Sequence, residues 1–483
     1  NFYTATVYEK GAEVIGMLKR LVGAEGYRAA LDLYFERHDG QAATIEDWLK
    51  VFEDATGRDL AQFKLWYSQA GTPRVRVGET FENGTYTLTL SQAVPPTPGQ
   101  AEKAPMVIPV AMGLISKEGR ELAPTRVLEL TEAEQSWTFE RLPERPVPSL
   151  LRGFSAPVIL EREASAEERL TLLAHDTDPF NRWEAGRALA KDTLARMVTE
   201  GTPPEPAYLE ALGRLAADDG LDPAFRALAL RLPSADDMAQ TLAEAGVVPD
   251  PQRIWEATRD LRGAIAQALE PTLAALYDAM AVPGPYTPDS VAAGRRALRA
   301  QALTLLTRLD GGARARAQIA AADNMTETLA ALGPLIEAGA AGDALAAFEE
   351  RWRDDRLVMD KWFALQVAFA PPEEAAPVAE RLTGHPLFDW KTPNRFRSVL
   401  GALATNAAGF HHASGRGYAL LADWLIRLDA VNPQTAARMT TAFETWPRYD
   451  ADRQQMMRAA LERIAATEGL SRDTTEMVTR ILG

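Results

Sequence analysis

Few side chains in this sequence are of the types that carry out chemistry on their own. It has no cysteine, and its five histidines are His38, His175, His385, His411 and His412. None of them stands in a His-Glu-x-x-His segment, the helical spacing that brings two imidazoles to one zinc ion. A Gly-x-x-x-x-Gly-Lys phosphate loop and a Gly-x-Ser-x-Gly nucleophile turn are also missing from the sequence. The residues taken alone therefore contain no complete catalytic set.

The pair His411-His412 is the one place where two imidazoles are close in sequence. Adjacent side chains on a helix point about 100° apart, so the two rings cannot share one metal ion from a helix. We expect the pair to be a feature of a surface loop.

Two helix starts near the C-terminus carry polar side chains of interest. Thr392 has the character of a helix cap with Pro393 in the first position, and Arg395 and Arg397 follow at once. Positive charges there oppose the helix dipole, and a broken local rule can mark a functional site. The other start is Asn432-Pro433-Gln434, where Gln434 and Arg438 are four residues apart on one face. Ordinary surface ion pairs are the competing interpretation of these arginines.

The elements that position these residues fall into three parts of the chain. The first part, residues 1–72, has the pattern of helices. Thr6 with Glu9 has the spacing of a capping box, as has Thr44 with Asp47. Apolar residues at helical spacing follow the first pair and predict one buried stripe: Val14, Ile15, Leu18, Leu21 and Val22. One helix is expected to end before Asp39, and a short one to run from about residue 60 to 68.

Residues 73–163 read as strands. Alternating runs on either side of Asn83-Gly84 predict a tight hairpin, because both central residues of such a turn need positive φ. Pro109 stands inside another apolar run and suits only an edge strand or a bulge. Several further short runs predict a small β-sandwich.

Residues 164–483 show only helical patterns. Ser165 with Glu168 is another capping box, and alanine-rich amphipathic segments follow, separated by short breaks. No strict repeat period is visible, so we expect an irregular, solenoid-like stack of helix pairs. The predicted fold class is multidomain and mainly α with a β-sandwich.

Length and composition limit the functions open to this chain. A chain of 483 residues is too long for one core, so two to four domains are expected. The net charge of −15 argues against nucleic acid as a partner, and no apolar run is long enough to span a membrane. Absence of cysteine fits the cytoplasm. The sequence does not begin with Met, so Asn1 is not expected to be the natural start.

Two segments resemble the aminopeptidase N family of zinc enzymes, most closely its bacterial alanyl aminopeptidase branch. The run Asn1-Phe2-Tyr3-Thr4-Ala5-Thr6-Val7-Tyr8-Glu9-Lys10-Gly11-Ala12 looks like the segment that follows the zinc motif in that family. The run Trp66-Tyr67-Ser68-Gln69-Ala70-Gly71-Thr72-Pro73 resembles the family's exit from its catalytic domain. The order of parts also agrees. By this resemblance the domains are the end of a thermolysin-like catalytic domain (1–72), a β-sandwich (73–163) and a helical array (164–483).

The resemblance also implies roles for particular residues. Tyr8 matches the catalytic tyrosine, whose hydroxyl donates a hydrogen bond to the oxyanion formed when water attacks the peptide carbonyl. Tyr3 matches a residue of the pocket for the first side chain of the substrate. Arg397, Gln434 and Arg438 match residues that contact the remainder of the peptide. Glu9 and Lys10 are expected to be structural.

The zinc ion that the family uses is held by two histidines and a glutamate upstream of the position of Asn1, and this chain contains no such ligands. We therefore expect the chain to be the C-terminal portion of a peptide-hydrolysing zinc aminopeptidase, inactive alone and partnered by the missing upstream segment. The alternative is a non-catalytic helical-repeat scaffold that binds peptides or proteins.

Overall fold

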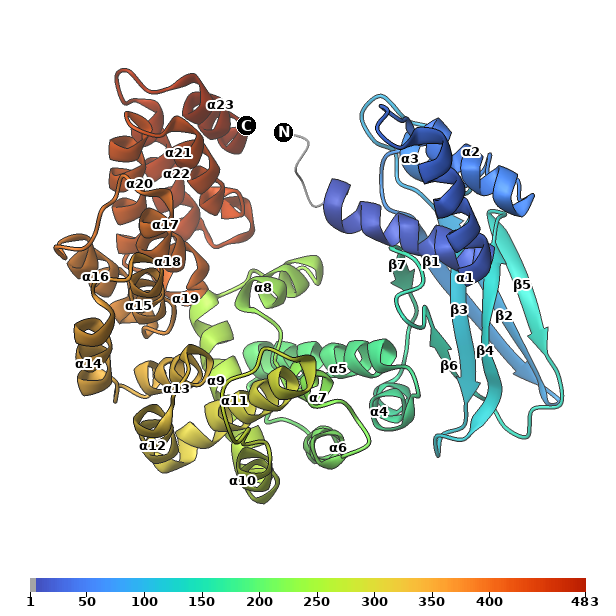
Figure 1. The fold of residues 1–483 in the computed structure, drawn as a ribbon, viewed down its shortest axis with the longest axis horizontal. Helices are drawn as coiled ribbons and strands as arrows, with labels where there is room; N and C mark the ends of the chain where they lie inside the picture. Colours follow the sequence, from blue (N-terminus) through green and yellow to red (C-terminus); the bar gives the residue numbers. More distant parts are fainter. Residues whose placement is uncertain (1–5) are drawn as a thin grey trace. The chain divides into compact units, whose positions relative to one another are not determined.

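The computed structural model of the chain describes residues 6–483 and divides it into two compact units (Figure 1). The first unit ends at Gly186 and the second runs from Arg187 to Gly483. The division falls inside one long helix, α5 (Pro179–Glu200).

The first unit begins with helices. A π-helical turn, η1 (Thr6–Lys10), leads directly into α1 (Gly11–His38), which is followed by α2 (Ile45–Thr56) and α3 (Leu65–Ser68). Gly23, with φ of 75°, breaks α1 into two helical stretches, and the second ends before Asp39 as predicted. The capping box of Thr44 and Asp47 is confirmed, with both of its hydrogen bonds formed. Thr6 already belongs to the turn η1, so its prediction as the capping residue was wrong.

Two sheets form the predicted β-sandwich. One sheet has the strand order β5-β2-β1-β7 and the other β4-β3-β6. The strands are β1 (Arg74–Glu82), β2 (Thr85–Ala93), β3 (Ile108–Ile115), β4 (Glu121–Leu130), β5 (Glu134–Phe139), β6 (Val147–Leu150) and β7 (Ile159–Glu161). All paired strands are antiparallel except β1 and β7.

Two local predictions for the sandwich can be checked against its register. Asn83 and Gly84 join β1 to β2 with φ angles of 49° and 76°, which confirms the hairpin. Pro109 lies in β3 opposite Glu129 of β4, but β6 pairs with β3 only from Met112 onward. The missing N–H of this proline therefore faces an unpaired side, and Pro109 behaves as an edge residue within a central strand.

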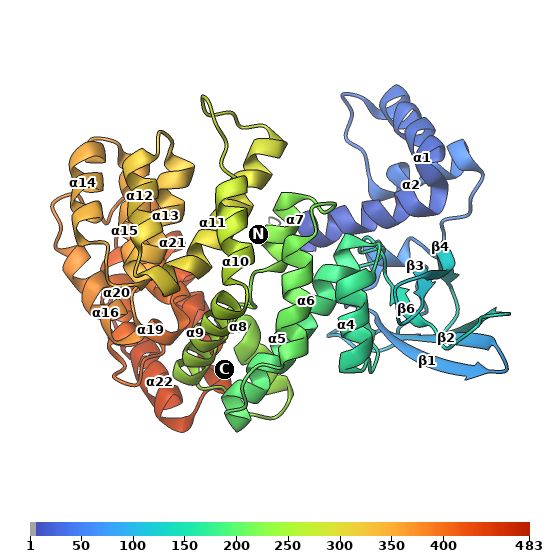
Figure 2. The same ribbon diagram turned by 90° about the horizontal axis from the view of Figure 1, so that it is seen from below.

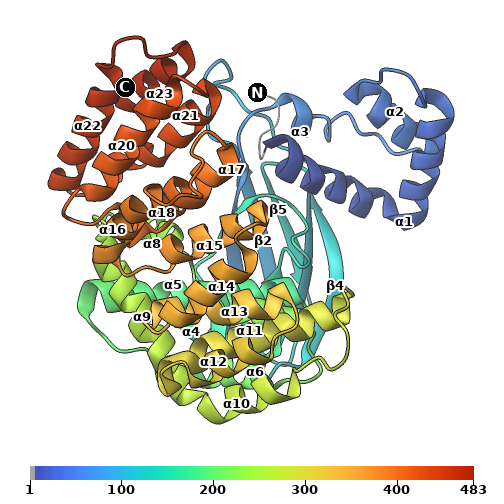
Figure 3. The same cartoon turned by 60° about the vertical axis from the view of Figure 1, so that its left-hand side comes forward.

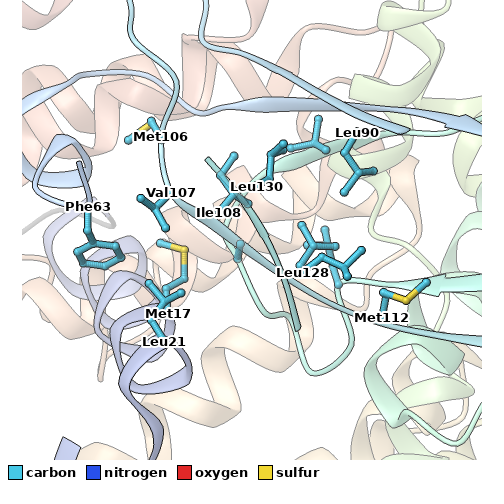
Figure 4. Packing of buried hydrophobic residues seen from close by; sticks show 14 of the residues in the cluster. Met17, Leu21, Phe63, Leu90, Met106, Val107, Ile108, Met112, Leu128 and Leu130 are labelled. Carbon is cyan, nitrogen blue, oxygen red and sulfur yellow. The ribbon is translucent and has the colours of Figure 1, made fainter. Parts of the chain in front are cut away.

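The helices α1–α3 and the sandwich share one hydrophobic core (Figure 4). Met17 and Leu21 of α1 and Phe63 are almost fully buried, and Figure 4 shows them gathered near Val107 at the start of β3. The indole nitrogen of Trp66 also donates a hydrogen bond to the carbonyl of Val107 at 2.8 Å. The segment after η1 is thus held in place by the sandwich as well as by its own helices.

The second unit consists of helices, as do the last residues of the first. Their bounds are α4 (Ala166–His175), α5 (Pro179–Glu200), α6 (Pro206–Ala217), α7 (Pro223–Ala229), α8 (Ala235–Glu244), α9 (Pro251–Ala268), α10 (Glu270–Ala279), α11 (Ser290–Asp310), α12 (Ala313–Ala321), α13 (Met325–Glu337), α14 (Gly342–Trp352), α15 (Arg356–Ala368), α16 (Pro372–Thr383), α17 (Pro393–Phe396), η2 (Arg397–Gly401), α18 (Ala402–Thr405), α19 (Ala407–Phe410), α20 (Arg416–Asp429), α21 (Pro433–Thr440), η3 (Thr441–Phe443), η4 (Trp446–Arg448), α22 (Ala451–Ala465) and α23 (Arg472–Leu482).

Helices of the second unit pack mainly against near neighbours in sequence. Helix α11 lies beside α10 (Figure 2) and also contacts α7, α9 and α13. Helices α20 to α23 gather at the C-terminal end (Figure 3). This neighbour-by-neighbour packing is that of the predicted helical array.

A buried carboxylate fixes the last helix of the array. Asp429, at the end of α20, accepts hydrogen bonds from the backbone N–H and hydroxyl of Ser471 and from the hydroxyl of Thr474, at 2.7, 2.5 and 2.6 Å. Only 4% of Asp429 is exposed. Charge-assisted hydrogen bonds of this kind are stronger than neutral ones, so this one side chain ties the start of α23 to α20.

His411 and His412 lie in the turn that follows α19, as expected, but the expectation that His411 lies at the surface was wrong. Only 5% of His411 is exposed, because its ring packs against Phe410, Tyr418 and Tyr449. Its Nδ1 lies 2.9 Å from the hydroxyl of Tyr418. Burial, with smaller contributions from two nearby arginines, lowers the pKa of His411 to about 3, so the ring is neutral at ordinary pH.

Candidate functional site

Tyr8 lies in the turn η1 at the start of the first unit. Its side chain is 59% exposed, so the ring is not a packed core residue. A tyrosine hydroxyl can donate a hydrogen bond to a bound group. An exposed side chain in this turn is consistent with the role that the resemblance assigns to Tyr8.

Lys10 anchors the turn that carries Tyr8. Its ammonium group donates to the carbonyl oxygen of Gly71 at 2.8 Å and to the hydroxyl of Thr72 at 3.3 Å. The same group lies 5.8 Å from the ring centroid of Trp66, within range of a cation–π contact, and partial burial lowers its pKa. Lys10 therefore joins the two segments on which the family resemblance rests.

The arginines after Thr392 have different roles. Arg395 is buried, forms an ion pair with Asp360 at 2.5 Å and donates to the carbonyl of Arg356 at 2.9 Å. The Asp360 carboxylate offsets the unfavourable position of Arg395 in the helix dipole, so the broken rule has a structural cause there. Thr392 precedes α17 as predicted, but its hydroxyl binds Asp389 instead of capping the helix.

Arg397, Gln434 and Arg438 are all exposed. Arg397 begins η2 and donates to the side-chain oxygen of Asn394 at 2.6 Å. Neither Arg397 nor Arg438 forms an ion pair with another described residue. Such pairing is common elsewhere in this acidic chain, which weakens the surface ion-pair interpretation of these two. Without a carboxylate partner among the described residues, these guanidinium groups can bind a carboxylate or carbonyl of a ligand.

Gly401 of η2 lies close to α21, the helix that carries Gln434 and Arg438. A β-carbon placed on Gly401 would lie 3.3 Å from Cβ of Arg397 and 3.8 Å from Cε of Met439. Met439 follows Arg438 in α21, so Arg397 lies beside the helix that carries Gln434 and Arg438. The structure thus groups the three predicted residues on neighbouring elements of the second unit. Tyr8 belongs to the first unit, and Tyr3 lies outside the described residues.

Sequence reasoning missed several residues that build this region. Asn394 holds the Arg397 side chain, and Asp360 holds Arg395 from a helix 35 residues away. Asn394 lies between Pro393 and Arg395, and an amide oxygen is a common partner of guanidinium groups, so the sequence carried a signal for this contact. Asp360 carried no such signal, because a contact at that separation depends on tertiary packing.

Within residues 6–483, no group of three or more histidine, aspartate or glutamate side chains is placed to hold a metal ion. These residues do not fit the zinc centre that the family resemblance implies. Among the described residues, no helix is both long enough and apolar enough to cross a membrane.

Comparison with known proteins defines the class of this chain. A family model for a domain of unknown function with ARM repeats (DUF3458_C) matches residues 166–483, and one for a domain of unknown function with an Ig-like fold (DUF3458) matches residues 71–163. The model of the peptidase family M1 domain matches residues 1–67. The chain therefore belongs to the aminopeptidase N family of M1 peptidases and matches its C-terminal part.

Individual relatives support the same assignment. Aminopeptidase N of Caulobacter vibrioides is 44% identical and that of Escherichia coli K12 is 39% identical, each over the whole of this chain. The chain spans 56% and 57% of the length of these two relatives. The crystal structure of Legionella pneumophila aminopeptidase A in complex with aspartic acid is similar to 99% of this chain, with a TM-score of 0.86 and 30% sequence identity. The match covers 57% of the Legionella chain.

Proposed function

We propose that this chain is the C-terminal portion of a zinc-dependent aminopeptidase that hydrolyses N-terminal amino acids from peptides. The observation that carries the proposal is the exposed Tyr8, held by the Lys10 anchor in a segment that resembles the catalytic part of the family. Identity of 44% to an aminopeptidase N over the whole chain supports it.

In this proposal the hydroxyl of Tyr8 donates a hydrogen bond to the oxyanion that forms on the scissile carbonyl. A donor aimed at charge that exists only in the transition state lowers the barrier without tightening ground-state binding. The contacts of Lys10 with Gly71 and Thr72 fix the turn, which limits the cost of orienting the hydroxyl.

The remaining proposed residues bind the substrate. Arg397, Gln434 and Arg438 are exposed on neighbouring elements, and the two guanidinium groups suit a peptide carboxylate or carbonyl. Tyr3 is proposed to line the pocket for the first side chain, by family resemblance alone.

The zinc ion, which supplies an activated water in such enzymes, is proposed to bind to the upstream segment. The chain alone is then inactive. We also propose a cytoplasmic location, supported by the absence of cysteine. The three domains proposed are 1–72, 73–163 and 164–483, supported by family models with nearly the same bounds.

The first experiment compares this chain with the protein extended by the upstream sequence of its gene. After dialysis, we expect about one zinc per extended protein, release of N-terminal residues from peptides, and neither property in the chain alone. Stoichiometric zinc and activity in the chain alone would refute the proposed location of the ligands. An extended protein that binds peptides but releases no residue would favour the scaffold alternative.

The second experiment tests Tyr8 in the active extended protein. Tyr8→Phe is expected to lower kcat by roughly 10²–10³, as for loss of an oxyanion donor, with KM little changed. Tyr34→Phe is the matched control, because Tyr34 packs against Trp48 in the α1–α2 pair. Equal turnover in the Tyr8 variant and the control would remove Tyr8 from the mechanism.

A further inference from the structure

A long connection joins β2 to β3 in the sandwich. It covers residues 94–107 and contains no helix or strand, only the isolated bridge between Thr97 and Gln100. Connections of roughly 12–15 residues or more without elements of their own are uncommon in compact domains, and those that are ordered usually serve a function. This connection, which we call the β2–β3 loop, is of that length, so its contacts are of interest.

Two side chains of the β2–β3 loop hold the link segment, residues 68–72, which leads from the end of α3 to β1. The Gln100 amide donates to the carbonyl of Ser68 at 2.9 Å and accepts from the backbone N–H of Ala70 at 2.8 Å. The Lys103 ammonium donates to the carbonyl of Ala70 at 2.9 Å. Both backbone polar groups of Ala70 are therefore bound by the loop.

Lys103 also ties the β2–β3 loop together. Its ammonium donates to the hydroxyl of Thr97 at 2.7 Å and to the side-chain oxygen of Gln100 at 2.9 Å. An ammonium group has three N–H donors. With the contact to Ala70, all three are directed at neutral oxygens of the loop and of the link segment. Lys103 thus fixes the position of one against the other.

The link segment in turn holds the anchor of Tyr8. Gly71 has a φ of 103°, and a β-carbon on it would lie 2.9 Å from Cγ1 of Val94 in the β2–β3 loop. A larger residue is disfavoured there by both the backbone conformation and the close approach. The carbonyl of Gly71 and the hydroxyl of Thr72 accept the hydrogen bonds of Lys10, at 2.8 and 3.3 Å. The loop therefore supports the atoms on which Lys10 depends.

We propose that Lys103 and Gln100 are positioning residues for Tyr8, acting through the link segment and Lys10 on the turn η1. This role rests on the proposed function, because it requires the Tyr8 hydroxyl to take part in the reaction. Misplacement of a reacting group by about 1 Å can cost about 10²-fold in rate, so partial loss of this support should lower kcat by less. The residues of the array proposed to bind peptide lie on other elements, so KM should change little.

The kinetic test is a double-mutant cycle in the extended protein. Lys103→Met keeps the aliphatic stem and removes the ammonium, and it should lower kcat about threefold to tenfold. In a Tyr8→Phe background it should have no further effect, because the hydroxyl that it positions is already absent. Lys117→Met is the matched control and should keep normal turnover, because Lys117 of the same sandwich binds Glu167 at 3.0 Å instead of the link segment.

Hydrogen exchange measures the support of the turn without any reaction. Amides of residues 6–22 should exchange about threefold faster or more in Lys103→Met than in Lys117→Met, because the start of the helix opens more often once its support is weakened. Gln100→Ala is a second, independent variant. It removes the contacts with Ser68 and Ala70 and should change kcat and exchange in the same direction.

The outcomes separate this role from the proposed function. If Tyr8→Phe is impaired but Lys103→Met and Gln100→Ala turn over like the control, the positioning role is refuted and the proposed function stands. An equal fall of kcat with and without the Tyr8 hydroxyl, or unchanged exchange of residues 6–22, would refute the link through η1. Normal turnover of Tyr8→Phe would remove Tyr8 from the reaction and this role of the loop with it.

Discussion

His411 should make the stability of the helical array depend on acid. Its pKa is about 3 in the folded protein, against about 6.5 for an unperturbed histidine. Between these two values the unfolded chain binds a proton that the folded chain does not, so the free energy of unfolding falls as pH falls from about 6.5 toward 3. With one pKa unit equal to about 1.4 kcal/mol, the loss between pH 7.5 and pH 5 is about 2 kcal/mol.

The assay is urea unfolding followed by the circular dichroism of the helices, at pH 7.5 and pH 5. Other groups also titrate in this interval, so the informative quantity is the difference between variants. His411→Asn keeps a polar atom near the hydroxyl of Tyr418 but cannot titrate. We expect it to be less stable than the natural protein at pH 7.5, and to lose about 2 kcal/mol less on acidification.

The neighbouring histidine provides the control. His412 is only partly buried and its Nδ1 lies 2.9 Å from the hydroxyl of Ser414. His412→Asn is the matched control, because it removes the adjacent imidazole, which is only partly buried. If His411→Asn and His412→Asn lose the same stability on acidification, the burial of a neutral His411 ring is not the cause of the acid sensitivity and the reasoning fails.

Four further variants test the packing and the proposed site. Gly417→Ala should destabilise the array by about 1–3 kcal/mol, because the new β-carbon would lie 2.6 Å from the backbone oxygen of Phe410. Gly263→Ala should stabilise the array by about 0.5–1 kcal/mol, because Gly263 lies within a helix and its new β-carbon meets open space. Equal melting temperatures of the two variants would contradict this expectation. Asp429→Ala should free the start of α23 and speed hydrogen exchange of its amides by tenfold or more, and unchanged protection would show that other contacts hold the helix. In the extended enzyme, Arg438→Ala should weaken peptide binding and leave the zinc content unchanged, so equal affinity for peptides of several lengths would argue against its assignment.

Much of the local structure follows from neighbouring residues and was therefore predictable. The capping boxes at Thr44 and at Ser165 are formed as predicted, because all their atoms lie within four residues. The Asn83-Gly84 hairpin is equally local. The family resemblance, which needs only the order of residues, identified the class of protein and the segment that carries Tyr8.

Contacts between distant residues were decided only by the tertiary structure. His411 was expected at the surface, and its burial depends on Tyr418 and Tyr449, which no local pattern places against it. The pairing of Arg395 with Asp360 joins residues 35 positions apart, and the contact of Lys10 with Gly71 joins residues 61 apart. A sequence determines caps, turns and buried stripes through short-range hydrogen bonding and periodicity, whereas the charge and burial of such side chains depend on which helices and strands finally pack together.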